Sequence, residues 1–288
     1  MGGVMIRGRT SSAIAVRRMD GGIEIDSQPL ATLYKGKWRN VPLIRGIIAL
    51  IETVALGTSA LMYSARVSTE TEDQKITSGM IWGSVAVGVV LAVVLFFVFP
   101  LLIVRAFDPL IASSFLSNLI EGVVRILFFI VYLALIGRMR DIREIFAYHG
   151  AEHMSVNAFE SGVPLNIGSV RNHSTAHTRC GTSFLLVVLV IAVAVFALLG
   201  RPPIWIGIIS RIILIPVIAA VSYELIKFEA KYSHNPFVRW LLVPGLWLQA
   251  LTTRRPDDGQ LEVAIAAMKK ALEIDGVFPD ADGCYSAP

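Results

Sequence analysis

The fold class of this chain is decided by the stretch Met80-Ile-Trp-Gly-Ser-Val-Ala-Val-Gly-Val-Val-Leu-Ala-Val-Val-Leu-Phe-Phe-Val-Phe-Pro-Leu-Leu-Ile-Val104. It carries no charged residue and is followed at once by Arg105. A helix needs about 20 apolar residues to cross the hydrocarbon core of a bilayer. The apolar residues form one run and show no 2- or 3.6-residue periodicity, so they predict a membrane-spanning helix and not a soluble core helix.

Composition agrees with a membrane protein. Of the 288 residues, 55% are hydrophobic and 17% are charged, and the mean hydropathy is +0.65. Soluble domains contain about 25% charged residues, so we exclude an ordinary soluble globular protein. Three further apolar runs, at 119–137, 182–200 and 204–226, bring the expected number of spans to about four. Pro216 predicts a kink in the last of these runs.

The predicted fold is an all-α membrane protein with interfacial amphipathic helices and a small N-terminal β-hairpin arm. Its expected regions are a cytoplasmic N-terminal arm (1–42), an interfacial or re-entrant helix and loop (43–79), spans one and two (80–137), a cytoplasmic His/Glu/Cys-rich segment (138–181), spans three and four (182–226), and an interfacial segment with a cytoplasmic C-terminal helix (227–288).

Three of these regions rest on local patterns. In the arm, two β-prone runs flank Asp20-Gly21, which favours a hairpin. Residues 43–64 are apolar but contain Glu52, and a central carboxylate costs about 2.5–3.5 kcal/mol on insertion scales; we therefore expect an interfacial or re-entrant helix there. Residues 257–274 predict an amphipathic helix that begins near Asp257 or Asp258.

Charge distribution predicts the orientation. If four segments span and 43–64 does not, all but four of the 26 Lys and Arg residues fall in loops and tails on one side. The four exceptions are Arg105, Arg125, Arg201 and Arg211. The positive-inside rule makes the basic side cytoplasmic. We therefore expect a multi-pass protein of the bacterial cytoplasmic membrane with both termini in the cytoplasm.

Candidate chemistry is concentrated between 148 and 180, where four of the five histidines lie. On a helix, His149 and His153 are one turn apart on one face and can hold one divalent ion. Glu152 completes an H-x-x-E-H pattern, the inverted zinc-peptidase form, in which the glutamate activates water for hydrolysis. His177 and Cys180 add an imidazole and a thiolate, and such N and S donors favour zinc over magnesium or calcium.

Each of these residues also has a structural reading. A histidine pair on a helix can serve as a polar cap or contact lipid headgroups. Cys180 opens an apolar helix and can be a small buried residue. Glu224 is costly inside a span and indicates function, unless it pairs with Arg211 or reaches the membrane surface.

Several stretches carry a family resemblance. They are 2–8, 148–153 (Tyr-His-Gly-Ala-Glu-His), 177–184 (His-Thr-Arg-Cys-Gly-Thr-Ser-Phe), 222–225, 248–256 and 260–265. Over nearly the whole chain, the sequence resembles the YqhQ-like family of bacterial membrane proteins, which are labelled predicted metal-dependent enzymes. The resemblance implies a metal near His149, Glu152, His153, His177 and Cys180.

Three functions follow as hypotheses. The first is a zinc-dependent hydrolase, with His149, His153 and His177 as ligands, Cys180 as a fourth donor and Glu152 as the general base. The second is a non-enzymatic scaffold or accessory subunit of a membrane complex, with the metal as a brace. The third is a small transporter, with Glu224 and Arg211 along its path. Expected partners are the lipid bilayer and a membrane protein or a second copy of the chain, with no nucleic acid.

Overall fold

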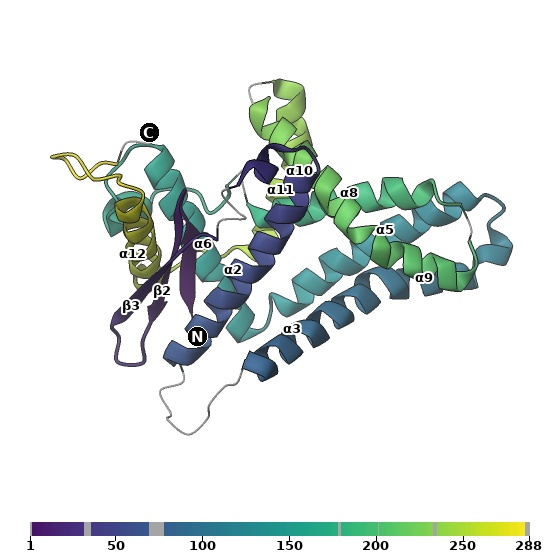
Figure 1. Cartoon of the computed structure of the whole chain (residues 1–288), viewed down its shortest axis with the longest axis horizontal. Coiled ribbons are helices and arrows are strands. Elements are labelled where there is room, and N and C mark those ends of the chain that lie inside the picture. Colours follow the sequence, from purple (N-terminus) through teal and green to yellow (C-terminus); the bar gives the residue numbers. More distant parts are fainter. Residues whose placement is uncertain are drawn as a thin grey trace.

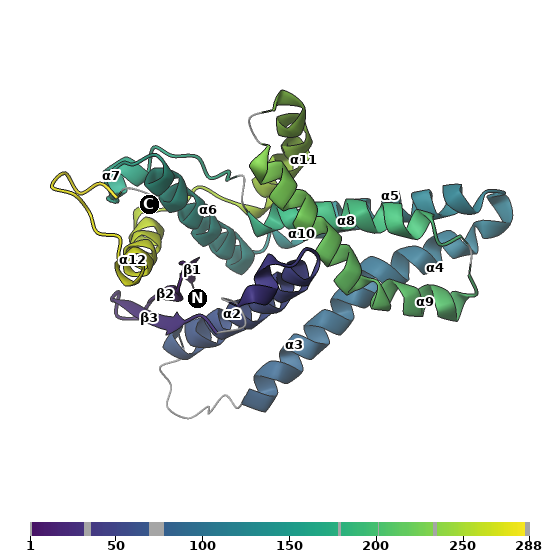
Figure 2. The ribbon, with the colours of Figure 1, turned by 45° about the horizontal axis from the view of Figure 1, so that its top comes forward.

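The computed structural model describes residues 2–31, 36–68, 78–177, 180–200, 202–232 and 235–285. The chain is mostly helical, with one small antiparallel sheet. Figure 1 shows a bundle of apolar helices on one side, and the sheet with two of its covering helices on the other. The turned view in Figure 2 keeps these two parts apart. We call them the apolar bundle and the sheet domain.

The apolar bundle contains the elements predicted as spans. They are α3 (Ser78–Val93), the π-helical turn η2 (Val94–Val98), α4 (Phe99–Ala106), α5 (Ser114–Ile136), α8 (Gly181–Ala197), α9 (Ile204–Ile213) and α10 (Ile215–Lys231). The α4–α5 connection, which contains the 3-10 turn η3 (Asp108–Leu110), and the α8–α9 connection both lie at the end remote from the sheet domain (Figure 1). The amide of Asn118 donates to the Gly200 carbonyl at 2.8 Å and joins the two ends.

Among the described residues, three helices are long and apolar enough to cross a membrane: Ile44–Val67, Trp82–Ala106 and Ser114–Ile136. A fourth crossing results if α9 and α10, bent by 45° at their junction, count as one span. That bend lies beside Pro216, where the sequence predicts a kink. The predicted span 182–200 forms only the 17-residue helix α8, which rises about 26 Å.

Helix α2 (Ile44–Ser68) covers the segment that we expected to be interfacial or re-entrant. It is one continuous helix, so the structure contains no re-entrant turn there. Its side chains divide between two environments: Glu52 and Ile48 are buried, whereas Ile51 and Leu61 are 49% and 71% exposed. Most of the loop that follows, residues 69–77, lies outside the described residues.

The sheet domain is built from both ends of the chain. Strands β1 (Gly3–Arg7), β2 (Ser11–Arg17) and β3 (Ile23–Pro29) form an antiparallel sheet in the order β1-β2-β3. The predicted hairpin is β2–β3, with Gly21 at a φ of +88° in its turn; β1 was not predicted. Helices α6 (Arg140–Glu160), α7 (Ile167–Val170) and α12 (Asp258–Ile274) pack with the sheet around one apolar core.

Two helix boundaries test the sequence patterns. The expected C-terminal helix is α12, and it begins with a capping box in which Asp257 and Gln260 exchange side-chain to backbone hydrogen bonds. The segment expected after the second span, 138–181, begins with a helix of its own. Helix α5 ends at Ile136, a turn follows, and α6 starts separately at Arg140.

Two elements lie near the junction of the two parts. The 3-10 turn η1 (Lys37–Asn40) precedes α2, and α11 (Pro236–Thr252) leads into the segment before α12. Helix α11 lies in the region 227–288, where we expected an interfacial segment, and it contains Pro244 in its interior.

Candidate metal centre

Helix α6 supplies the first two donors of the candidate site. His149 and His153 are one turn apart on one face, as the spacing predicts, and their ring centroids are 4.3 Å apart. Gly150 allows the segment after α11 to approach: a Cβ at this position would lie 2.1 Å from the Arg254 carbonyl oxygen. The Arg254 amide donates to the Phe146 carbonyl at 2.9 Å, which fixes that segment against α6.

Backbone carbonyls orient both imidazoles. Nδ1 of His149 lies 2.9 Å from the Thr252 carbonyl oxygen, and Nδ1 of His153 lies 2.6 Å from that of Thr175. A carbonyl can only accept, so each Nδ1 carries the proton and Nε2 keeps the lone pair in the neutral ring. Metal-binding histidines in proteins commonly have this second hydrogen bond.

Cys180 joins the two histidines from a different part of the chain. It caps the N-terminus of α8, and its Sγ accepts from the Thr182 amide at 3.4 Å. Nε2 of His149 is 3.3 Å from this sulfur. Donor atoms of His149, His153 and Cys180 all lie within 4.8 Å of one another. The structure therefore brings together three of the predicted ligands, from α6 and from the start of α8.

The pKa values in this cluster shift toward a thiolate–imidazolium pair. Burial raises the pKa of Cys180, but hydrogen bonds from His149, His153 and Thr182 outweigh it and lower the pKa to about 5. Burial lowers the pKa of His149, but the hydrogen bond and charge of Cys180 outweigh it and raise the pKa to about 9. A deprotonated sulfur is the form that binds metals and attacks electrophiles.

A cavity of about 240 Å³ opens beside these donors. Its walls are Ile6, Arg7, His149, Glu152, His153, Val156, His177, Cys180 and Gly181. Burial raises the pKa of the Glu152 carboxyl, against the opposing charges of His149 and His153. Glu152 therefore lies on the cavity wall with a carboxylate whose basicity is increased.

His177 lies next to the three donors but is not one of the converging group. Its ring centroid is 5.8 Å from that of His153, and its Nε2 lies 3.3 Å from a carboxylate oxygen of Glu160. Gln249 holds its backbone, accepting from the His177 amide at 2.9 Å and donating to its carbonyl at 2.8 Å. In this arrangement His177 contributes to the wall of the cavity and His149, His153 and Cys180 contribute the donors.

Sequence reasoning missed the part of the site that the N-terminal strand provides. Ile6 and Arg7 of β1 form one wall of the cavity, across from α6. The resemblance included residues 2–8, but nothing in that pattern indicated where the strand would lie. Gly2 also packs closely, because a Cβ there would lie 1.7 Å from the Tyr148 ring.

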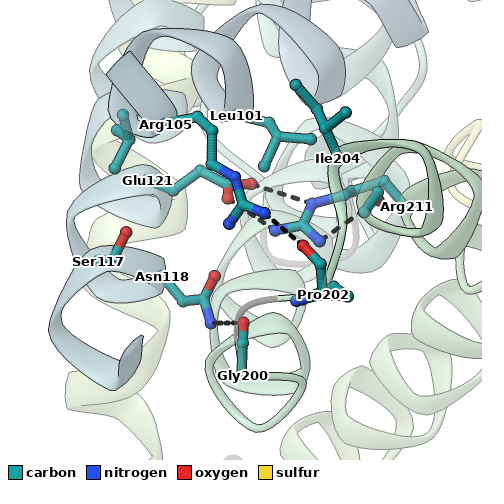
Figure 3. Close-up of a pocket in the computed structure, with 11 residues that line it drawn as sticks. Leu101, Arg105, Ser117, Asn118, Glu121, Gly200, Pro202, Ile204 and Arg211 are labelled. Atoms are coloured by element: carbon teal, nitrogen blue, oxygen red, sulfur yellow. Dashed lines mark hydrogen bonds and ion pairs between the residues drawn. The ribbon is translucent and has the colours of Figure 1, made fainter. Parts of the chain in front are cut away.

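A second polar cluster lies inside the apolar bundle (Figure 3). Glu121 and Arg125 form the i,i+4 ion pair that their spacing allows, and Arg211 from α9 binds the same carboxylate at 2.7 Å. The pairing of Arg211 with Glu224 is therefore not observed. Glu224 accepts instead from Arg45 and from the Leu43 amide.

The guanidinium of Arg125 also donates a hydrogen bond to the π-helical turn η2. Its Nε donates to the Phe96 carbonyl at 2.8 Å, and the group lies 4.9 Å from the centre of the Phe196 ring. A π-bulge leaves carbonyls without their ordinary helical partners. The Glu121 cluster thus fastens α3–α4, α5, α8 and α9 to one another.

The sequence was compared with known proteins. Residues 41–274 match the model of a family described as a protein of unknown function, DUF1385. The chain is 32% identical to the uncharacterized protein YqhQ of Bacillus subtilis (strain 168), over 96% of this chain and 91% of the relative. No solved structure matches the chain. The matched region contains all of α6 and the start of α8, and the identity extends over nearly the full length, so this chain belongs to the DUF1385 family together with YqhQ.

Proposed function

We propose that this protein is a metal-dependent hydrolase that works at the cytoplasmic surface of a membrane. The observation that carries the proposal is the convergence of His149, His153 and Cys180 beside a cavity that also contains Glu152. Three N and S donors from the protein, with a further position left for water or substrate, are typical of catalytic zinc sites.

The donor set fits zinc in three respects. Zinc–nitrogen and zinc–sulfur distances are about 2.0–2.3 Å, so donors within 4.8 Å of one another need only small side-chain adjustments to share an ion. Both imidazoles have their second nitrogen fixed by a carbonyl. The sulfur is favoured as a thiolate. A divalent ion held there would supply Lewis-acid chemistry and make water more acidic.

Glu152 is the general base in this proposal. It lies between the two histidines in sequence and faces the same cavity. A carboxyl whose pKa is raised by burial accepts a proton from water more readily at neutral pH. In this proposal the three donors bind the ion and Glu152 takes the proton from water.

The position of α2 supports a site at the membrane surface. Glu52 in the middle of α2 pairs with Arg7 of the sheet domain at 2.7 Å, and Tyr63 donates to Glu24 of β3 at 3.0 Å. A helix that contacts the sheet domain along one face and exposes apolar residues on another is typical of an interfacial helix. We propose that α2 lies along the membrane and that the sheet domain is cytoplasmic, as the basic loops indicate.

The first test is elemental analysis of the detergent-purified full chain, prepared without chelator. We expect about one zinc per chain in the wild type and a loss of zinc in the double variant His149→Ala/His153→Ala. Cys180→Ser should lower the zinc content as well. Absence of metal above background in the wild type would refute the metalloenzyme proposal.

A second candidate, a thiol-dependent hydrolase, is favoured by the His149–Cys180 pair itself. A thiolate held by an imidazolium is a nucleophile without any metal. The two candidates separate on inhibition. A chelator should abolish activity in the first case and leave it intact in the second, whereas Glu152→Gln should be severe only in the first.

The scaffold and transporter hypotheses have less support. The apolar face of α12, including Leu261 and Met268, is buried against its own sheet domain, so it is not free for a partner. Among the described residues, Glu224 pairs with Arg45 and Arg211 pairs with Glu121, so the two residues have separate ion-pair partners. A scaffold would still be indicated if metal were bound but no substrate were turned over.

A further inference from the structure

We infer that the cavity takes a substrate that bears a phosphoryl group, and that Arg7 of the N-terminal strand binds the phosphoryl oxygens. This inference rests on the proposed function for the metal donors, but it assigns a different residue and a different role. Arg7 lies on the cavity wall, on β1 and not on α6 or α8, which carry the donors.

The side chain of Arg7 is held in place by hydrogen bonds, but not all of its N–H groups have an acceptor. Its Nε donates to Glu52 at 2.7 Å and its Nη1 to the Gly8 carbonyl at 3.3 Å. Within the described part of the chain, Nη2 donates to no acceptor. The side chain is 37% exposed, whereas that of its partner Glu52 is 4% exposed. The ion pair therefore holds the guanidinium in place, and Nη2 is left for a ligand in the cavity.

With a divalent ion bound, the charge of the cavity walls favours an anion. Among the lining residues described, Arg7 carries a positive charge, the Glu152 carboxylate and the Cys180 thiolate carry negative charges, and three imidazoles complete the wall. The two positive charges of the ion then leave the site with a net positive charge. Guanidinium groups bind phosphate and carboxylate oxygens through charge-assisted hydrogen bonds, and a metal with a nearby arginine is a common arrangement for transfer of a phosphoryl group.

The size of the cavity limits which phosphoryl compounds can enter it. A volume of about 240 Å³ lies below the about 300–1,000 Å³ of most small-molecule sites. It fits a phosphate ester or a lipid headgroup, with any acyl chains outside. Both sources share the same chemistry: water adds to phosphorus, the ester P–O bond breaks, and the leaving oxygen takes a proton.

The test measures binding of inorganic phosphate by isothermal titration to the full chain in neutral detergent, with zinc content measured on the same samples. We expect wild type to bind phosphate and Arg7→Gln to bind about tenfold more weakly or worse, because a charged hydrogen bond is lost. Arg9→Gln, two residues along and not on the cavity wall, should bind within about twofold of wild type. Zinc content should be equal in all three.

Arg7→Lys should recover part of the affinity, because it restores the charge but not the planar fork. A parallel titration with short-chain dihexanoyl phosphatidic acid distinguishes the two sources. Tighter binding than inorganic phosphate indicates a lipid headgroup, and weaker binding indicates a soluble phosphate ester.

The outcomes separate this inference from the hydrolase proposal. Zinc-loaded wild type that binds neither phosphate nor phosphatidic acid would overturn the role of Arg7 and leave the metal site standing. Loss of zinc in Arg7→Gln would also overturn it, because Arg7 would then be structural. Phosphate binding that depends on Arg7 in a protein without zinc would support the anion site and refute the metalloenzyme.

Discussion

Nε2 of His149 lies 3.3 Å from Sγ of Cys180, although 31 positions separate the two residues in the chain. One belongs to a helix of the sheet domain and the other caps the first turn of an apolar helix. Their contact joins the two parts of the molecule at the point where the cavity opens.

In metal-free protein, we expect alkylation of Cys180 by iodoacetamide to reach half its maximal rate near pH 5, because the thiolate is the reactive form. An ordinary thiol titrates near about 8.5. The rate should therefore stay high from pH 6 upward and fall only as the pH drops through the lowered pKa. Mass spectrometry of the modified peptide gives the rate.

Two comparisons control this measurement. In His149→Ala the midpoint should move upward, because the largest stabilising contact of the thiolate is gone. Cys284, whose pKa is raised by burial and by nearby aspartates, should react only at alkaline pH. Identical pH profiles for the two cysteines would contradict the prediction.

Glu152→Gln and His177→Ala should behave differently. Glu152→Gln should keep its zinc and lower kcat by about 10²–10⁴-fold, the usual loss when a general base is removed. His177→Ala should also keep its zinc, because its ring nitrogen contacts Glu160 and lies outside the converging donors. Elemental analysis checks both variants, and loss of zinc in His177→Ala would make it a ligand after all.

Gly150→Ala should destabilise the protein, because its methyl group would overlap the Arg254 carbonyl. Forcing an extra carbon into a packed contact costs about 1–3 kcal/mol of the free energy of unfolding. Gly57→Ala is the matched control: this helical glycine has no atom near its would-be Cβ, so the change should be neutral or stabilising by up to about 1 kcal/mol. Apparent Tm in detergent measures both, and equal Tm values would contradict the close approach.

Glu121→Gln should be among the most damaging changes in the apolar bundle. It removes the one carboxylate that pairs with both Arg125 and Arg211. Breaking a buried ion pair by removing one partner costs about 3–5 kcal/mol. Glu262→Gln, which breaks an exposed pair with Arg17, should cost about 1 kcal/mol or less. A similar Tm for the two variants would show that the buried cluster contributes little.

Much of the fold could be predicted from local patterns. The four apolar runs predicted the helices of the bundle, Asp20-Gly21 predicted the β2–β3 hairpin, and Asp257 or Asp258 was predicted as the start of α12. These features depend on residues close together in the chain. Strand β1 had no such local signal, because Gly2-Gly3 weakens a strand pattern. It forms a strand by pairing with β2.

The candidate site divides in the same way. Helical spacing alone placed His149 and His153 on one face. The spacing in the sequence could not show whether His177 or Cys180 lies beside the two histidines. Gln249 holds the backbone of His177, and the N-terminal cap of α8 holds the Cys180 sulfur. These contacts join residues far apart in sequence, and loop closure leaves many alternative arrangements of such a segment.

By itself, then, the sequence determined the local elements: apolar helices, a hairpin, a capped C-terminal helix and a pair of histidines one turn apart. The tertiary structure alone decided that Cys180 lies beside His149 and His153, that Arg7 lines the cavity, and that Arg211 pairs with Glu121 and not with Glu224. The physical reason is the sequence separation over which each kind of interaction acts. Hydrogen bonding and side-chain periodicity within one helix or hairpin act over a few residues, whereas the site is formed by packing between elements from both ends and the middle of the chain.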